Sequence, residues 1–260
     1  MIKGGDFYAV FNEATGLWST DEDVLIKLVD AEVMAVYKQV SEENPHDRVV
    51  AALMRYADSG SIDRWHKYVQ KQSRDNFKML DDELCFSNTE LKREIYASHQ
   101  LDYPLEKGKC EAWDTIMSTL YSPEERRKIE WAIGSVVNGD SKRIQKFMVF
   151  YGAPGTGKST VLNIVDDLFH GYTAPFESKT LGSANAQFAL EPFKDNPLVG
   201  IQHDGDLSKI EDNTRINSLV AHEVMSVNTK YGKLYSTAFR TFLFMISRSE
   251  ERFSRNAETD

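Results

Sequence analysis

The chain has 260 residues, a net charge of −9 and 41% hydrophobic residues, which suits one large folded domain or two smaller ones. No apolar run approaches the ~20 residues that a membrane helix needs, and two cysteines are too few for a disulfide framework. These features exclude a membrane protein and a disulfide-stapled secreted domain, and they favour a cytoplasmic location.

The acidic balance limits how the chain could contact nucleic acid. A protein coated in basic surface is excluded by the net charge of −9. Any contact with DNA would need a local basic patch, or several subunits that pool their charge around a channel.

Residues 1–105 are predicted to form a mainly α-helical N-terminal domain with a small β-hairpin at its start. Apolar residues at 7–11 and 17–18 flank a turn-like segment, and helical patterns follow at 24–37, 47–56, 62–70 and 74–80. Pro104 and Gly108 interrupt the periodicity, so a domain boundary is expected near residue 105.

Residues 106–143 are predicted to form a helical connector. Ser122 is a helix cap, Pro123 occupies the first turn, and Glu125 completes a capping box. Asn138 and Gly139 supply the stop signal, so the helix should end there and lead into the next domain.

Residues 144–260 alternate predicted strands and helices, which indicates an α/β domain with a parallel-type sheet. An apolar strand at 146–151 runs into the segment 152–160, which fits the phosphate-loop pattern G-x-x-x-x-G-K-[ST]. A helix with apolar residues at helical spacing follows this segment. Strand, loop and helix therefore occur in the order that a nucleotide-binding loop requires; the alternative is a chance match in a glycine-containing turn.

The loop predicts binding of ATP with Mg²⁺. Its glycines allow successive backbone N–H groups to turn toward a phosphate, at the positive end of the following helix. Lys158 is expected to reach the β- and γ-phosphates, and Ser159 to ligate Mg²⁺. The predicted nucleotide-binding residues are Gly152, Ala153, Pro154, Gly155, Thr156, Gly157, Lys158, Ser159 and Thr160.

Two carboxylates follow a second apolar strand at 198–201. ATP hydrolysis needs an acidic group for the magnesium shell and often a second group that orients the attacking water. We assign Asp204 to magnesium and Asp206 to the water, so Lys158, Asp204 and Asp206 are the catalytic candidates. The alternative is that both aspartates mark an ordinary turn.

In residues 224–237, apolar and polar residues alternate on both sides of a glycine-containing centre, and this pattern predicts a β-hairpin. Its tip carries Lys230, Tyr231 and Lys233, a combination that can grip phosphates and stack on a base of single-stranded DNA. An exposed turn that merely contains lysines is the alternative. A further strand at 240–246 ends in Ser247 and Arg248, candidate sensors of the γ-phosphate.

Together these motifs resemble the superfamily 3 helicases, which are AAA+ ATPases, and in particular the phage and poxvirus-type primase-helicases. The resemblance rests on residues 152–160, Asp204 with Asp206, residues 210–219, the hairpin around Lys230, and residues 241–245. It implies a P-loop AAA+ domain behind a helical domain, in the host cytoplasm if phage-encoded. It also implies an ATP-hydrolysing motor that forms a homo-oligomeric, usually hexameric, ring around single-stranded DNA.

The chain departs from this family in two places. Arg248, preceded by Ser247, stands where the family usually has an asparagine sensor, and Arg252 and Arg255 lack the context of the family's interface arginines. The ATPase domain is therefore expected to be truncated at its C-terminal end. Three functions remain open: a DNA helicase or translocase in phage or mobile-element replication, a nucleotide-dependent DNA-binding or loading module, and a small-molecule P-loop kinase.

Overall fold

A computed structural model describes residues 1–4, 7–46, 48–52, 77–206, 210–230 and 234–248. The chain forms two compact units, Met1–Met79 and Leu80–Asp260. The expected boundary near residue 105 lies inside the second unit, and Leu101 belongs to the hydrophobic core there. The division into domains at 1–105, 106–143 and 144–260 stays a prediction.

The first unit begins with three short antiparallel strands, β1 (Ile2–Lys3), β2 (Tyr8–Asn12) and β3 (Leu17–Ser19). The predicted hairpin is confirmed, because Phe11 pairs with Trp18 across β2 and β3. Helix α1 (Glu22–Glu43) follows, and Asp21 caps it by accepting a hydrogen bond from the backbone N–H of Asp23. The predicted helix at 62–70 lies outside the described residues, and residues 77–80 are not helical. The mainly helical character of this region therefore stays a prediction.

The second unit is a mixed α/β structure built on a four-stranded parallel sheet. Its strands are β4 (Met148–Gly152), β5 (Thr173–Pro175), β6 (Val199–Gly205) and β9 (Phe242–Arg248), in the spatial order β4-β9-β6-β5. The last strand in sequence therefore lies between β4 and β6. Phe244 of β9 pairs with Met148 on one side and with Ile201 on the other.

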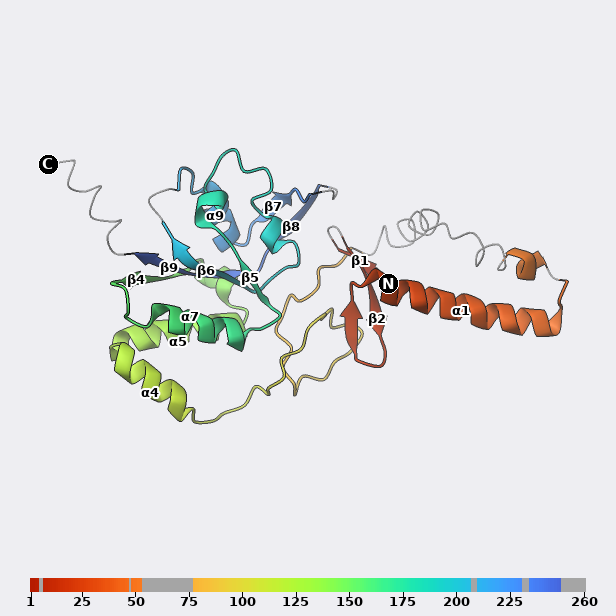
Figure 1. Ribbon diagram of the computed structural model, residues 1–260, viewed down its shortest axis with the longest axis horizontal. Helices are drawn as coiled ribbons and strands as arrows, with labels where there is room; N and C mark the ends of the chain where they lie inside the picture. The colour runs from red at the N-terminus through yellow and green to blue at the C-terminus, as the bar shows by residue number, and fades with distance from the viewer. Residues whose placement is uncertain (5–6, 47, 53–76, 207–209, 231–233, 249–260) are drawn as a thin grey trace. The chain divides into compact units, whose positions relative to one another are not determined.

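Both faces of the sheet are covered (Figure 1). Helices α4 (Glu111–Leu120), α5 (Pro123–Val137) and α7 (Lys158–Leu168) lie on one side. The other side carries α9 (Thr214–Val220) and the antiparallel hairpin of β7 (Val224–Val227) and β8 (Tyr235–Ala238). The described part of this unit also contains the short helices α6 (Ser141–Ile144) and α8 (Ser178–Leu181) and the 3-10 turn η1 (Glu191–Phe193).

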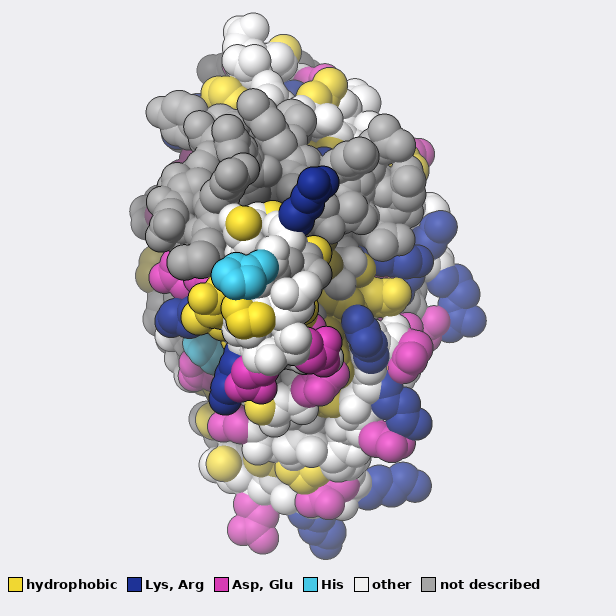
Figure 2. Space-filling view, turned by 90° about the vertical axis from the view of Figure 1, so that its right-hand side faces the viewer, with side chains coloured by type: hydrophobic (Ala, Val, Ile, Leu, Met, Phe, Trp, Pro, Cys, Tyr) yellow, Lys and Arg dark blue, Asp and Glu magenta, His cyan; other side chains and the backbone are white. Residues whose placement is uncertain are grey.

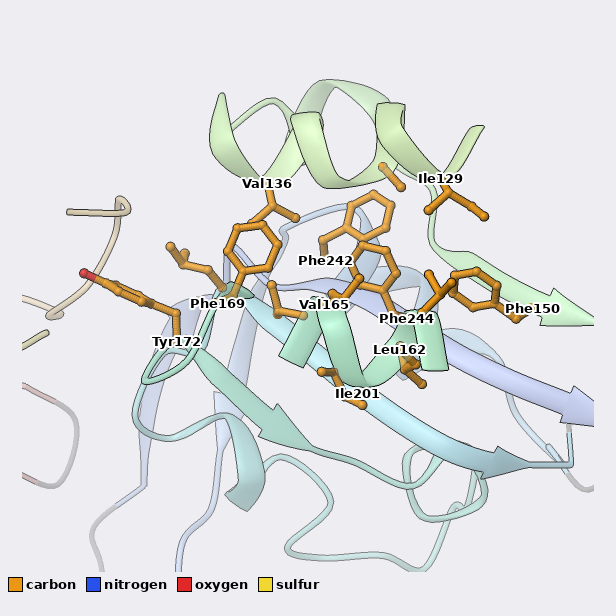
Figure 3. Packing of buried hydrophobic residues seen from close by; sticks show 14 of the residues in the cluster. Ile129, Val136, Phe150, Leu162, Val165, Phe169, Tyr172, Ile201, Phe242 and Phe244 are labelled. Atoms are coloured by element: carbon orange, nitrogen blue, oxygen red, sulfur yellow. The ribbon is translucent and has the colours of Figure 1, made fainter. Parts of the chain in front are cut away.

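Alternating side chains of β9 fill two separate cores. Phe242 and Phe244 pack with α5 and α7, whereas Leu243 and Met245 belong to the cluster on the opposite face. This alternation follows from the two-residue period of a strand, and a strand that is apolar at every position needs cover on both faces. Figure 3 shows the first core, in which Ile129 and Val136 of α5 point toward the aromatic rings of the sheet.

The helix signals in the connector are confirmed. Ser122 Oγ accepts a hydrogen bond from the backbone N–H of Glu125, and the Glu125 side chain accepts one from the backbone N–H of Ser122. Helix α5 ends at Val137, with Asn138 as its C-cap. Within the described parts of the chain, no helix has the length and apolar character to cross a membrane.

Within the second unit, residues 80–110 form no helix or strand and are held to the rest of the unit partly by the hydroxyl groups of Tyr172, which is buried, and Tyr103, which is half-buried. The Tyr172 hydroxyl accepts a hydrogen bond of 3.1 Å from the backbone N–H of Cys85 and donates one of 2.6 Å to the carbonyl of His99. The hydroxyl of Tyr103 donates to the carbonyl of Leu168 at the end of α7, and burial raises the pKa of Tyr103 to about 12. These bonds anchor the segment beside the end of α7.

Candidate functional site

The segment 152–157 forms a tight loop between the carboxyl end of β4 and the first residue of α7. Gly152, Gly155 and Gly157 have φ angles of 145°, 78° and 77°. Only glycine adopts such angles without steric cost, so the three glycines make this turn possible. The predicted strand, loop and helix are thus present in the expected order.

Gly157 also lies close to the connector, which the sequence did not indicate. A Cβ atom at this position would lie 2.4 Å from Cδ1 of Leu120, the last residue of α4. The end of α4 therefore packs directly on the loop. No local pattern around Leu120 signals this contact, because the two residues are brought together only by the folded connector.

Lys158 is the first residue of α7, and its side chain folds back onto the loop. Its ammonium group donates hydrogen bonds to the carbonyl oxygens of Gly152 (2.8 Å) and Ala153 (2.6 Å), and it lies 3.2 Å from Oγ1 of Thr156. The side chains of Ser159 and Thr160 are exposed in the first turn of α7. The first N–H groups of a helix have no intrahelical acceptor, so this turn and the ammonium group together suit an anion.

The two aspartates lie at the end of β6, but in a different arrangement from the one expected. The strand continues through Gly205, so Asp204 lies within the strand and does not follow it. Gln202 of β6 pairs with Met245 of β9, and Gly205 pairs with Ser247. Between these two pairs β6 advances by three residues, whereas β9 advances by only two. This extra residue is a β-bulge, which leaves His203 and Asp204 both exposed, and Asp206 half-buried just beyond the strand.

The loop and the aspartates occupy the same edge of the sheet. Gly152 pairs with Arg248, Tyr151 with Ser247, and Ser247 with Gly205. The ends of β4 and β6 are therefore two strand spacings apart, about 10 Å. Ser247 is buried between them, at 5% exposure, and Arg248 ends β9 opposite the first glycine of the loop.

The predicted hairpin is confirmed by the pairing of Val227 with Tyr235. Lys230 is exposed in the connection between β7 and β8, while Tyr231 and Lys233 lie outside the described residues. Figure 2 shows acidic and basic side chains interspersed over the face that it displays. Because Lys230 is exposed, it stays a candidate contact for DNA.

Residues 150–260 match a family of unknown function (DUF5906). No curated protein matches the chain.

Solved structures of the C-terminal region of NrS-1 are similar to this chain. An A-form apo structure has a TM-score of 0.45 at 13% sequence identity, and the match covers 71% of this chain and 48% of the NrS-1 chain. A second apo structure has a TM-score of 0.44 at 12% identity, covering 72% of this chain and 48% of its own. The chain spans about half the length of these structures.

Proposed function

We propose that this chain is an ATPase that binds Mg·ATP at residues 152–160. The observation that carries the proposal is the position of the Lys158 ammonium group, which lies against the carbonyl oxygens of a glycine-rich loop at the start of an 11-residue helix. Lys158 would exchange its carbonyl partners for β- and γ-phosphate oxygens, which make stronger hydrogen bonds because both the donor and the acceptor then carry charge.

Hydrolysis requires acidic groups on the same edge of the sheet. Mg²⁺ is commonly bound through one or two protein ligands together with the phosphates, and Ser159 and Asp204 are suitable oxygen donors. Asp206 would orient the attacking water. The pairing of β9 between β4 and β6 supports this proposal, because it brings all three strand ends to one edge. Ser247 and Arg248 are the proposed γ-phosphate sensors.

The ATPase would act on DNA, as a superfamily 3 AAA+ helicase or translocase in phage or mobile-element replication. Lys230 is exposed between two paired strands, where a hairpin can present it to a ligand. Together with Tyr231 and Lys233 it would contact single-stranded DNA in the pore of a homo-oligomeric, hexameric ring. Pooling such hairpins from several subunits would concentrate positive charge in the pore, although each chain carries a net charge of −9.

The test is steady-state ATP hydrolysis with and without single-stranded DNA, with oligomeric state measured by light scattering. Hydrolysis that rises with DNA, together with assembly in Mg·ATP, supports the proposal. ATP binding without turnover would favour a loading module instead, and phosphoryl transfer to a small molecule would favour a kinase. A protein that binds no nucleotide contradicts the proposal.

A further inference from the structure

The side chain of Gln202 joins two elements beside the proposed magnesium site. Gln202 lies on β6 immediately before the bulge, and only 8% of it is exposed. Its Oε1 accepts a hydrogen bond of 3.0 Å from the backbone N–H of Ser178, the first residue of α8. Its Nε2 donates a hydrogen bond of 3.2 Å to the carbonyl oxygen of Asp204. One amide thus connects α8 to the backbone of the bulge.

The same amide packs against the residue that closes the bulge. A Cβ atom at Gly205 would lie 3.1 Å from Cδ and 3.2 Å from Oε1 of Gln202, and 3.1 Å from Cε of Met245. A side chain at position 205 would therefore push against the amide. Gln202 and Gly205 fit each other, and the backbone between them carries His203 and Asp204.

We propose that Gln202 is a positioning residue that holds the bulge and so directs the Asp204 carboxylate toward the carboxyl edge of the sheet. A bulge changes the direction in which a strand presents its side chains, and here it exposes Asp204. The inference rests on the proposed function, because it assigns Gln202 to the site at which Asp204 would bind magnesium.

The chemistry of the two bonds explains why an amide is needed. One partner is an N–H donor and the other a carbonyl acceptor, so the side chain between them must both accept and donate. An ionised glutamate can accept the hydrogen bond from the N–H of Ser178, but it cannot donate one to the carbonyl oxygen of Asp204. One of its carboxylate oxygens would face that carbonyl oxygen, and the two would repel each other. Leucine does neither, and it would leave the buried N–H of Ser178 without this partner.

The experiment compares Gln202→Glu and Gln202→Leu with the wild type, measuring ATP hydrolysis over a range of Mg²⁺ concentrations and ATP binding in EDTA. Removing a residue that orients a metal ligand commonly costs about 10-fold or more in metal affinity or activity. Both variants should raise the Mg²⁺ concentration for half-maximal rate and lower kcat by about this factor. ATP affinity in EDTA should stay unchanged, because the loop at 152–160 is not altered.

Thr241→Val is the matched control. Thr241 is also buried, and its hydroxyl donates a hydrogen bond of 2.5 Å to the carbonyl of Pro197, but it precedes β9 at the opposite edge of the sheet. This variant should keep the wild-type Mg²⁺ dependence even if its melting temperature falls. Gln202→Glu, which keeps the size of the side chain, carries the test if Gln202→Leu does not fold.

Three results would overturn the inference, and they can be told apart. Wild-type hydrolysis that both Gln202 variants retain, with unchanged Mg²⁺ dependence, would contradict the positioning role and leave the proposed ATPase intact. A wild-type protein that does not hydrolyse ATP would contradict the proposed function, and the inference with it. An equal shift in Thr241→Val would show a general effect of core damage and would also overturn the positioning role.

Discussion

The ammonium group of Lys158 lies 2.8 Å from the carbonyl oxygen of Gly152, at the opposite end of the loop that precedes it. A second bond to Ala153 and a contact with Thr156 complete its surroundings. The lysine therefore closes the loop on itself, and its charge is held where an anion would be bound. A phosphate would compete for the same ammonium group, so loop conformation and nucleotide binding should be coupled.

The two aspartates should separate magnesium binding from water activation. Asp206→Asn should retain Mg·ATP binding but lose hydrolysis, whereas Asp204→Asn should weaken the magnesium-dependent part of the affinity. The measurement is ATP affinity with Mg²⁺ or EDTA, alongside hydrolysis rates. Undiminished hydrolysis in both variants would show that the two aspartates have no catalytic role and only mark the end of a strand.

Lys230 tests the contact with DNA. If it contacts a phosphate, Lys230→Ala should lower the affinity for single-stranded DNA and reduce the slope of log affinity against log salt by roughly 0.7. Fluorescence anisotropy in Mg·ATP at high protein concentration measures both quantities, since assembly should be favoured there. Lys146→Ala is the control, because Lys146 is also exposed but precedes β4, at the other end of the strand from the loop. Equal slopes for Lys230→Ala and the wild type, in an assembled sample, would contradict the contact.

The capping box at the start of α5 should contribute measurably to stability. Ser122→Ala removes the acceptor for the Glu125 N–H and should cost about 1 kcal/mol. In a unit of this size the melting temperature should fall by roughly 2–4 °C. Ser118→Ala, at an exposed position inside α4, is the control and should not lower it. Thermal denaturation followed by circular dichroism gives both values, and equal melting temperatures would argue against the cap.

His99 should make stability depend on pH. A hydrogen bond to Asp81, with Nδ1 3.3 Å from Oδ2, raises the pKa of His99 and outweighs the opposing effect of burial. Because the folded state binds this proton more tightly, the stabilisation is fully present below the unfolded pKa of about 6.5 and is lost as pH rises through the folded pKa. The stability difference between wild type and His99→Gln should therefore be larger at about pH 5.5 than at about pH 8.5. Denaturant unfolding at both pH values measures it, and a difference independent of pH would contradict the assignment.

Signals within a short stretch of sequence predicted local structure correctly. The strand and helix around the loop, the α5 cap at Ser122 and the β7–β8 hairpin each depend on residues a few positions apart. The pairing of Met148 with Phe244, the contact of Leu120 with Gly157 and the bulge at Asp204 depend on residues that only the tertiary fold brings together. No local pattern encodes these relationships. The sequence therefore identified the candidate residues, but it did not predict how they are arranged relative to one another.

The central claim is that residues 152–160 bind Mg·ATP through Lys158, and titration calorimetry tests it most directly. ATP with Mg²⁺ should bind the wild type and Lys146→Ala saturably at one site per chain. Lys158→Ala should remain folded and bind at least about tenfold more weakly, since a charged hydrogen bond contributes about 1.5–3 kcal/mol. Wild-type affinity in Lys158→Ala, or no binding to the folded wild type, would contradict the account.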